Sequence, residues 1–247
     1  MPSRFESLTG VHPVGEALRA RRRELGRLRV EEGRAAELAG LVGLAREAGV
    51  PVEEVPAASL AGIGEGGRVP RFALEAGPVP EASLDGLLEG AGSEPCLVAL
   101  DGVEDPQNLG AIIRSAEGAG ATGVVLTTRR APPLSPAVSR ASAGALEHLP
   151  VGRVTNLRRE LKLLKKKGFW ILGADQEDGD DLFASPDRWF RGPLVALLGA
   201  EGRGIRPGVS SELDHRVRIP MHGRVGSLNV ASAAAVLLYE IRRRRRG

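Results

Sequence analysis

Continuous apolar runs alternate with amphipathic segments over the last two-thirds of the chain. The runs are short and uninterrupted, which predicts strands that are buried on both faces. They lie at 96–100, 123–127, 169–172 and 194–198, and two further strands are predicted at 149–154 and 216–219. The segments with helical spacing lie at about 109–119, 136–146, 157–167 and 228–245, with Asn156 as the N-cap of the third. Strands that alternate with helices in this way predict an α/β fold with a parallel sheet covered by helices.

The first 90 residues show a less regular pattern. Apolar residues recur at helical spacing in two segments, and a short strand-like run follows them. These elements lie at Val14–Leu28, Ala35–Glu47 and Val50–Val52. Glycine and proline are frequent between 60 and 92, which predicts turns, short strands and a linker. We therefore predict a small α/β N-terminal domain with its linker, residues 1–90, and a second domain, residues 91–247.

Composition excludes several classes of protein. The chain has 247 residues, of which 42% are hydrophobic and 26% charged, as is typical of soluble globular proteins. No apolar run approaches the roughly 18 residues that a membrane span needs. The N-terminus lacks the basic and apolar regions of a signal peptide, so we expect a cytoplasmic protein. With Cys96 as the single cysteine and four scattered histidines, we expect neither a disulfide nor a metal site.

Charge is distributed unevenly. Residues 1–90 carry a net charge of −3 and residues 91–247 one of +6, and five consecutive arginines, Arg242–Arg246, lie next to the C-terminal residue. The planar guanidinium of arginine suits phosphate, although a GC-rich genome also enriches arginine. A basic end is compatible with nucleic-acid binding and equally with a solvated helix end, where cations complement the helix dipole.

Three polar or glycine-rich segments directly follow predicted strands. They read Asp-Pro-Gln-Asn-Leu-Gly-Ala-Ile-Ile-Arg-Ser-Ala at 105–116, Leu-Gly-Ala-Glu-Gly-Arg-Gly-Ile at 198–205 and Ile-Pro-Met-His-Gly-Arg-Val-Gly-Ser-Leu-Asn-Val-Ala-Ser at 219–232. Ligands of open parallel sheets bind beyond the carboxyl ends of the strands, so this placement indicates a binding site.

Each segment also has an ordinary structural interpretation. The first combines a helix N-terminus with an arginine, which suits an anion but also describes a capped surface helix. The glycines of the second allow close approach of a ligand or form a tight turn. The small residues of the third allow ligand approach or close helix packing. None of the three matches the dinucleotide fingerprint or the P-loop.

Taken together and in this order, the three segments resemble the motifs of the SpoU (TrmH-type) RNA ribose 2′-O-methyltransferases. The resemblance covers about residues 96–243. Residues Gly10–Leu18 are similar to the opening of that family's small substrate-binding domain, which has a ribosomal-protein-like fold. The resemblance implies a SPOUT fold with a C-terminal deep trefoil knot, S-adenosylmethionine as cofactor and a homodimer. The layout is most similar to enzymes that methylate a guanosine ribose in bacterial large-subunit (23S) rRNA.

The resemblance also assigns site residues. It places five residues in catalysis and four against the cofactor. The catalytic set is Asn108, Arg114, Glu201, Ser227 and Asn229, and the cofactor set is Gly199, Ile219, Met221 and Leu228. An arginine keeps its proton up to a pKa above about 12. We therefore expect Arg114 to hold the target phosphate and lower the pKa of the 2′-hydroxyl, and direct proton abstraction is the less favoured alternative.

The other catalytic residues receive supporting roles. Asn108 and Asn229 are expected to orient the arginine and the substrate, Glu201 to pair with an arginine, and Ser227 to hydrogen-bond near the ribose.

RNA contact is expected on the N-terminal domain and on two basic stretches, Arg19–Arg29 and Arg158–Lys167, with the terminal arginines as a third. Solvated helix faces are the competing interpretation. Aromatic residues make up only 3% of the chain, which disfavours a base-stacking platform. The competing functions are a tRNA 2′-O-methyltransferase, a non-catalytic RNA-binding or ribosome-assembly protein, and a Rossmann-type nucleotide enzyme, which the missing fingerprint disfavours.

Overall fold

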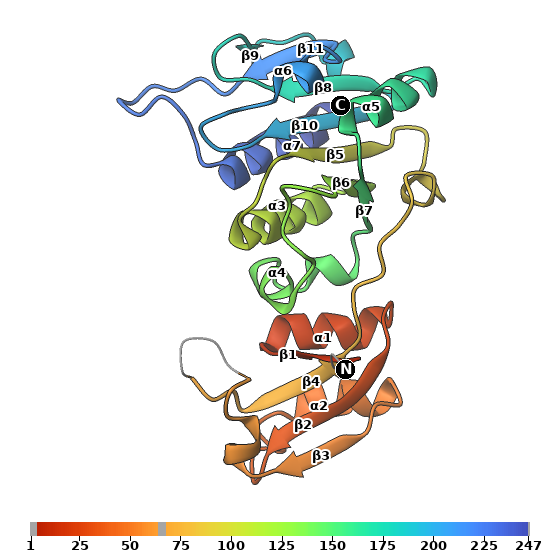
Figure 1. The fold of residues 1–247 in the computed structure, drawn as a ribbon, viewed down its shortest axis with the longest axis vertical. Helices are drawn as coiled ribbons and strands as arrows, with labels where there is room; N and C mark the ends of the chain where they lie inside the picture. The colour runs from red at the N-terminus through yellow and green to blue at the C-terminus, as the bar shows by residue number, and fades with distance from the viewer. Residues whose placement is uncertain (1–3, 64–67, 247) are drawn as a thin grey trace. The chain divides into compact units, whose positions relative to one another are not determined.

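The computed structural model describes residues 4–63 and 68–246, and the chain forms two compact units (Figure 1). The first unit extends to Pro80 and also contains Pro133–His148, whereas Glu81–Pro132 and the chain from Leu149 onward form the second. Residues 64–67, which belong to the stretch expected to form turns, and residues 1–3, part of the segment considered as a signal peptide, lie outside the described residues.

The contacts of the chain divide it before the expected boundary at residue 90. Leu87 belongs to the core of the second unit, where it packs with Leu97. Ala82 forms an isolated parallel bridge with Gly152. These contacts join 81–90 to the second unit.

A seven-stranded sheet organises the second unit. Its spatial order is β7 (Val151–Val154), β6 (Gly123–Thr127), β5 (Cys96–Asp101), β10 (Leu194–Gly199), β8 (Trp170–Ala174), β11 (His215–Arg218) and β9 (Asp180–Asp181). Every neighbouring pair is parallel. The predicted α/β fold with a parallel sheet is therefore confirmed, and all six predicted strands are present in it.

Helices flank this sheet (Figure 1). They are α3 (Pro106–Gly118), α5 (Leu157–Lys166), α6 (Pro207–Ser210) and α7 (Val230–Arg245), with 3-10 helices η2 (Gly86–Leu88) and η4 (Asp187–Phe190). Asn156 caps α5 as predicted, because its Oδ1 accepts from the Arg159 amide at 3.1 Å. The α3 helix begins earlier than expected, since Asp105 caps it and proline at N1 has the φ that a helix requires. Helices α3 and α7 pack against each other.

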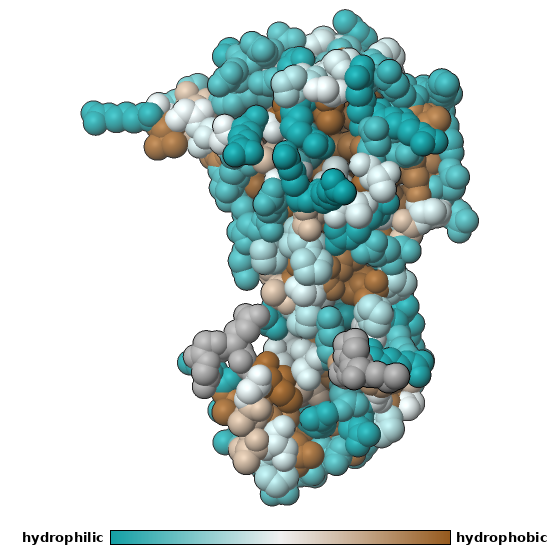
Figure 2. Space-filling view, viewed as in Figure 1, coloured by the Kyte–Doolittle hydropathy of each residue, from teal (hydrophilic) through white to brown (hydrophobic). Residues whose placement is uncertain are grey.

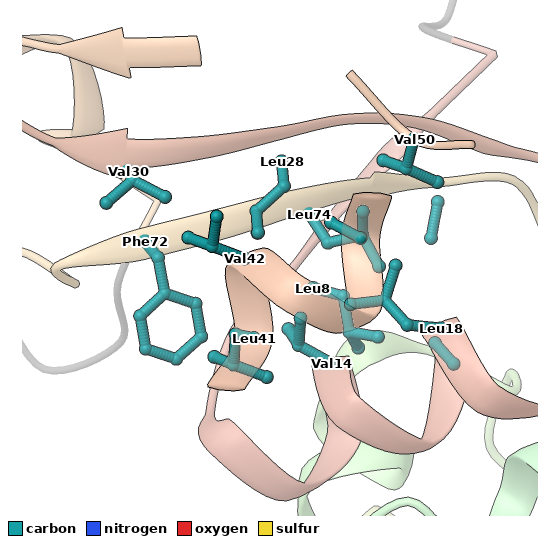
Figure 3. Packing of buried hydrophobic residues seen from close by; sticks show 13 residues of the cluster. Leu8, Val14, Leu18, Leu28, Val30, Leu41, Val42, Val50, Phe72 and Leu74 are labelled. Carbon is teal, nitrogen blue, oxygen red and sulfur yellow. The ribbon is translucent and has the colours of Figure 1, made fainter. Parts of the chain in front are cut away.

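The first unit is a separate α/β body. Its sheet has the order β1 (Glu6–Leu8), β4 (Phe72–Ala76), β2 (Leu25–Glu31) and β3 (Val52–Val55). Its helices are α1 (Val11–Ala20), α2 (Ala39–Glu47), η1 (Ala57–Leu60), α4 (Pro136–Ala141) and η3 (Ala145–Glu147). Figure 3 shows Leu8, Val14, Leu28, Val42 and Leu74 in the core that the sheet shares with α1 and α2.

Two expectations for these elements are wrong. The predicted helix over Val14–Leu28 ends at Ala20, because Arg21 is left-handed (φ 50°) and Leu25 and Leu28 belong to β2. The helix expected at 136–146 stops at Ala141, and Ala143 and Gly144 both have positive φ. The short strands expected between 60 and 92 are represented by β4, which pairs with both β1 and β2.

The basic stretch Arg19–Arg29 does not form a continuous RNA-facing helix. Arg23 is buried, and its guanidinium makes an ion pair with Glu147, each side chain being 1% exposed. It also donates to the Ser139 hydroxyl at 3.3 Å and the Gly77 carbonyl at 3.2 Å. Arg23 therefore anchors the Pro133–His148 segment within the first unit.

The five C-terminal arginines differ in burial, because Arg242, Arg243 and Arg246 are exposed whereas Arg244 is buried and Arg245 is half-buried. Arg244 is buried and donates to Glu240 and Asp187, at 2.6 Å each, while its guanidinium lies 4.6 Å from the Phe190 ring centroid. Arg245 donates to the carbonyls of Phe190 and Gly192 at 2.8 and 2.7 Å. These two arginines hold the end of α7 against the segment around η4.

Candidate active site

The three motif segments meet at the carboxyl ends of the central strands. Strands β5 and β10 are neighbours, with Asp101 in register with Gly199. From this pair the sheet continues to β6 on one side and to β8 on the other. The direction in which successive strands are added therefore reverses between β5 and β10. Such a reversal leaves a crevice at the carboxyl ends of the strands, where open α/β sheets bind ligands. The first motif follows β5, and the second follows β10.

Three polar side chains, one from each motif, are joined by hydrogen bonds. The Asn108 amide donates to Glu201 Oε1 at 3.2 Å. The Asn229 amide donates to the same oxygen at 2.6 Å and to Asn108 Oδ1 at 3.0 Å. We call Asn108, Glu201 and Asn229 the polar triad. The sequence placed all three in the site, and the structure brings them together.

Asn229 is held at both ends of its side chain. While its Nδ2 donates within the triad, its Oδ1 accepts from the backbone amides of Ala231 at 2.9 Å and Ser232 at 3.4 Å. It is therefore the N-cap of α7, where an asparagine oxygen satisfies otherwise unpaired helix amides. The expectation that Glu201 pairs with an arginine is wrong, because its carboxylate accepts hydrogen bonds from two asparagine side chains instead.

A tight turn presents Glu201. Ala200 and Gly204 exchange backbone hydrogen bonds of 3.1 and 2.9 Å. A Cβ atom at Gly199 would overlap the backbone of Gly204, so only glycine permits this close crossing. Gly202 and Gly204 have positive φ, which side chains rarely adopt.

A buried carboxylate fixes the far end of the turn. Asp101 is 1% exposed and accepts from the Arg206 backbone amide at 2.9 Å and from its Nε at 2.8 Å. The hydrogen bond to Asp101 raises the pKa of the Arg206 guanidinium. This pair was not predicted from the sequence. Its only sequence signal is that Asp101 ends an otherwise apolar strand.

A cavity of about 500 Å³ lies beside the turn. Gly199, Ile219 and Leu228, three of the four residues expected at the cofactor, line it, and so does Ser227. Met221, the fourth, is half-buried. It does not belong to the described residues that line this cavity.

The segment after β8 forms another wall of this cavity. The Gln176 amide donates to the Ile219 carbonyl at 3.1 Å. Asp175 loses solvation, which raises its pKa, but backbone amides and Arg216 at 2.7 Å lower that pKa overall. The role of this segment was not predicted from the sequence. The signal that could have identified it is the polar run directly after the apolar strand.

A second cavity, of about 430 Å³, adjoins the first. Glu201, Arg203 and Val230 line both cavities. Asn108 lines the second. The polar triad therefore stands where the two cavities meet.

Arg114 stands apart from the triad. It is exposed on α3, lines neither cavity, and forms no hydrogen bond or ion pair with any residue that the structure describes. The loop between β11 and α7 is also exposed, and Val225 is 70% exposed. This loop projects from the second unit with a hydrophilic tip (Figure 2).

Two further kinds of feature are absent from residues 4–63 and 68–246. No helix in these ranges is long and apolar enough to cross a bilayer. No group of three or more histidine, cysteine, aspartate or glutamate side chains in the same ranges has an arrangement that suits a metal ion.

Comparison with known proteins gives matches to both parts of the chain. Residues 95–239 match the model of the SpoU rRNA Methylase family, and residues 7–82 match that of the RNA 2′-O ribose methyltransferase substrate-binding domain. The 23S rRNA (guanosine-2′-O-)-methyltransferase RlmB of Pseudomonas putida is 36% identical over 98% of each chain.

Solved structures agree with these matches. The SpoU methyltransferase AviRb from Streptomyces viridochromogenes, in complex with the cofactor AdoMet, superposes with a TM-score of 0.82 at 27% identity, over 99% of this chain and 91% of that one. A structure that concerns 2-OH methylation of C/U34 on tRNA gives a TM-score of 0.55 at 28% identity, and covers 63% of this chain and 99% of that one.

Proposed function

The chain belongs to the SpoU rRNA Methylase family, and we propose that it transfers a methyl group from S-adenosylmethionine to the ribose 2′-hydroxyl of a guanosine in large-subunit (23S) rRNA. The relative from Pseudomonas putida, whose name states this reaction, matches along nearly the whole chain. The observation that carries the proposal is the polar triad, which unites three separated motifs beside a cavity.

The larger cavity fits the cofactor. Its volume of about 500 Å³ lies within the range of small-molecule sites. Ile219 and Leu228 offer apolar walls, and Gly199 lets the backbone approach closely. Met221, two residues beyond Ile219, is proposed to join this wall in the loaded protein. When bound, S-adenosylmethionine supplies an electrophilic methyl group with its own leaving group.

The protein's own residues then position the ribose. The Glu201 carboxylate, fixed by two asparagine amides, keeps acceptor capacity for a ribose hydroxyl. Ser227 lines the cofactor cavity, where its hydroxyl can donate to or accept from the same sugar. Positioning of this kind lowers the barrier because the reacting groups are already aligned.

Arg114 is assigned to the RNA backbone. Its guanidinium has no partner among the described residues, so it is available for a phosphate. A cation held near the 2′-hydroxyl lowers the pKa of that hydroxyl. An arginine side chain is a poor proton acceptor because it keeps its own proton at neutral pH. This favours a role in holding the phosphate over direct abstraction of the 2′-hydroxyl proton.

Membership of the family supports further proposals about assembly. We infer that the C-terminal part contains a deep trefoil knot, that the enzyme is a cytoplasmic homodimer, and that the first unit binds rRNA. The match of residues 7–82 to a substrate-binding domain supports the last of these.

The rival functions are less well supported. The tRNA-related structure covers only 63% of this chain, whereas the rRNA relative covers 98%. A pure binding protein would not need the intact polar triad. Incubation with methyl-labelled cofactor and separate rRNA and tRNA pools tests the proposal. We expect label as 2′-O-methylguanosine in large-subunit rRNA, and label confined to tRNA or absent from both would refute it.

A further inference from the structure

The second cavity has a mixed lining whose charges are only partly used. Asp101 is paired with Arg206, and Glu201 is engaged by the two asparagines of the triad. Asp105 caps α3 by accepting from the Gln107 amide at 3.0 Å. These groups maintain the fold of the site and cannot turn freely toward a ligand.

Three charged side chains of this lining remain available. Glu104, Arg130 and Arg203 line the cavity, are exposed, and form no hydrogen bond or ion pair with the residues of 4–63 and 68–246. Arg130 also has a φ of 61°, a conformation that costs a side-chain-bearing residue free energy. One free carboxylate and two free guanidinium groups therefore face one concave space.

We propose that this cavity binds the guanine base of the target nucleotide, an inference that rests on the proposed function. A carboxylate has two acceptor oxygens and matches the adjacent N1–H and N2–H₂ donors of guanine. Guanidinium groups match the O6 and N7 acceptors on the other edge. Glu104 takes the donor edge in this assignment, and Arg130 and Arg203 take the acceptor edge.

The mixture of charges favours a base over a phosphate. A phosphate site would gain from cations alone, and Glu104 would repel the anion. Single-stranded RNA bases are recognised in this way, by hydrogen bonds to their exposed edges. Because Glu201 and Arg203 line both cavities, a base in the second cavity leaves its ribose beside the polar triad and the cofactor cavity.

Base analogues in a synthetic RNA fragment around the mapped nucleotide test this assignment. Inosine keeps N1–H, O6 and N7 but lacks the N2 amino group. We expect the wild-type protein to methylate the inosine RNA about tenfold more slowly than the guanosine RNA, as loss of one buried contact predicts. Glu104→Ala should slow methylation of the guanosine RNA by a similar factor. This variant should then methylate the guanosine and the inosine RNA at equal rates. Glu117→Ala, an exposed α3 change that lines neither cavity, should keep the wild-type ratio.

The failures are distinguishable. If guanosine RNA is methylated but wild-type protein and Glu104→Ala show the same guanosine-to-inosine ratio, the base assignment is wrong while the methyltransferase function stands. If Glu104→Ala tightens binding of every RNA and Arg130→Ala weakens it equally, the cavity holds a phosphate instead. If no RNA is methylated, the proposed function itself fails. Calorimetric titration with S-adenosylmethionine checks that each variant is folded.

Discussion

The Asn229 amide donates to the Glu201 carboxylate over 2.6 Å, although the two residues are 28 positions apart. The same asparagine caps the helix that follows it. The contact therefore couples the start of α7 to the turn after β10. Any change that removes the carboxylate leaves the Asn229 amide without this partner and frees both loops.

Replacement of Glu201 by alanine should impair turnover more than cofactor binding. Two hydrogen bonds to a charged group are lost, each contributing about 1.5–3 kcal/mol. The rate of methyl transfer should fall by a factor of about 100 or more. Single-turnover assays with labelled cofactor measure it, with Glu117→Ala as the control. A rate within threefold of wild type would mean that the triad is only structural.

Arg114→Ala should abolish methylation and leave cofactor affinity nearly intact. The side chain lines neither cavity, so its loss removes a phosphate contact without altering the cofactor wall. The salt dependence of RNA binding should also become shallower, because one counterion-releasing contact is gone. Filter binding at several salt concentrations and a methylation assay measure both effects. Retained turnover would remove Arg114 from the mechanism.

Gly199→Ala should destroy the turn that carries Glu201. A Cβ there overlaps the Gly204 backbone, which cannot move without breaking the Ala200–Gly204 hydrogen bonds. We expect loss of calorimetric S-adenosylmethionine binding and of activity together. Gly208→Ala, where a Cβ meets open space, is the matched control and should bind normally. Normal binding by Gly199→Ala would contradict the assignment of this turn to the cofactor.

The terminal arginines should differ sharply in their effect on stability. Arg244→Ala removes the buried guanidinium that donates to Glu240 at 2.6 Å, and a hydrogen bond to a charged group contributes about 1.5–3 kcal/mol. Glu240 remains paired with the exposed Arg243, so the loss is that of one hydrogen-bonded partner of two. Arg242→Ala changes an exposed helix position and should shift the free energy of unfolding by less than about 0.5 kcal/mol. Urea denaturation of both variants measures the difference. Equal destabilisation of the two variants would show that Arg244 does not anchor the end of α7.

His215 should make stability depend on pH. Its ring stacks against both tryptophans of the chain, and its centroid lies 5.4 Å from that of Trp170 and 4.1 Å from that of Trp189. Burial lowers its pKa, and Arg188 lowers it further against the opposing charges of Asp214 and Asp180. The unfolded chain therefore binds the proton more readily, and its contribution to stability is intact above an ordinary pKa of about 6.5.

This contribution should be lost as the pH falls from about 6.5 through the lowered pKa of the folded state. Urea unfolding followed by tryptophan fluorescence at several pH values measures the loss. His215→Phe keeps an aromatic ring in the stack and should flatten this part of the profile, while the exposed His222→Gln should not. An unchanged profile in His215→Phe would assign the pH dependence to other groups.

The parallel sheet was predictable because its central strands, β5, β6 and β10, are short runs of buried residues. Cys96–Asp101 is buried at every position, and the sequence shows this directly as an apolar run. The first unit was harder. Leu25 and Leu28 fit a helix by spacing alone, and only long-range pairing with β4 makes them part of a strand. Pairing partners that are distant in the sequence leave no local signal.

The site shows the same contrast. Asn108, Glu201 and Asn229 were predictable as a set from motif order, but their mutual hydrogen bonds were not. Glu201 was expected to meet an arginine, and two neutral amides occupy it instead. Arg206, which follows the second motif, pairs with Asp101 because the turn after β10 folds back over the end of β5. Such pairings depend on loop geometry, which spacing does not encode.

A crystal structure of the protein with S-adenosylmethionine bound is the most direct test of the site. We predict that the cofactor occupies the cavity lined by Gly199, Ile219 and Leu228, with its methyl group directed toward Glu201 and the second cavity. A cofactor bound elsewhere on the sheet, or one in this cavity with its methyl group directed away from the polar triad, would contradict the proposed mechanism.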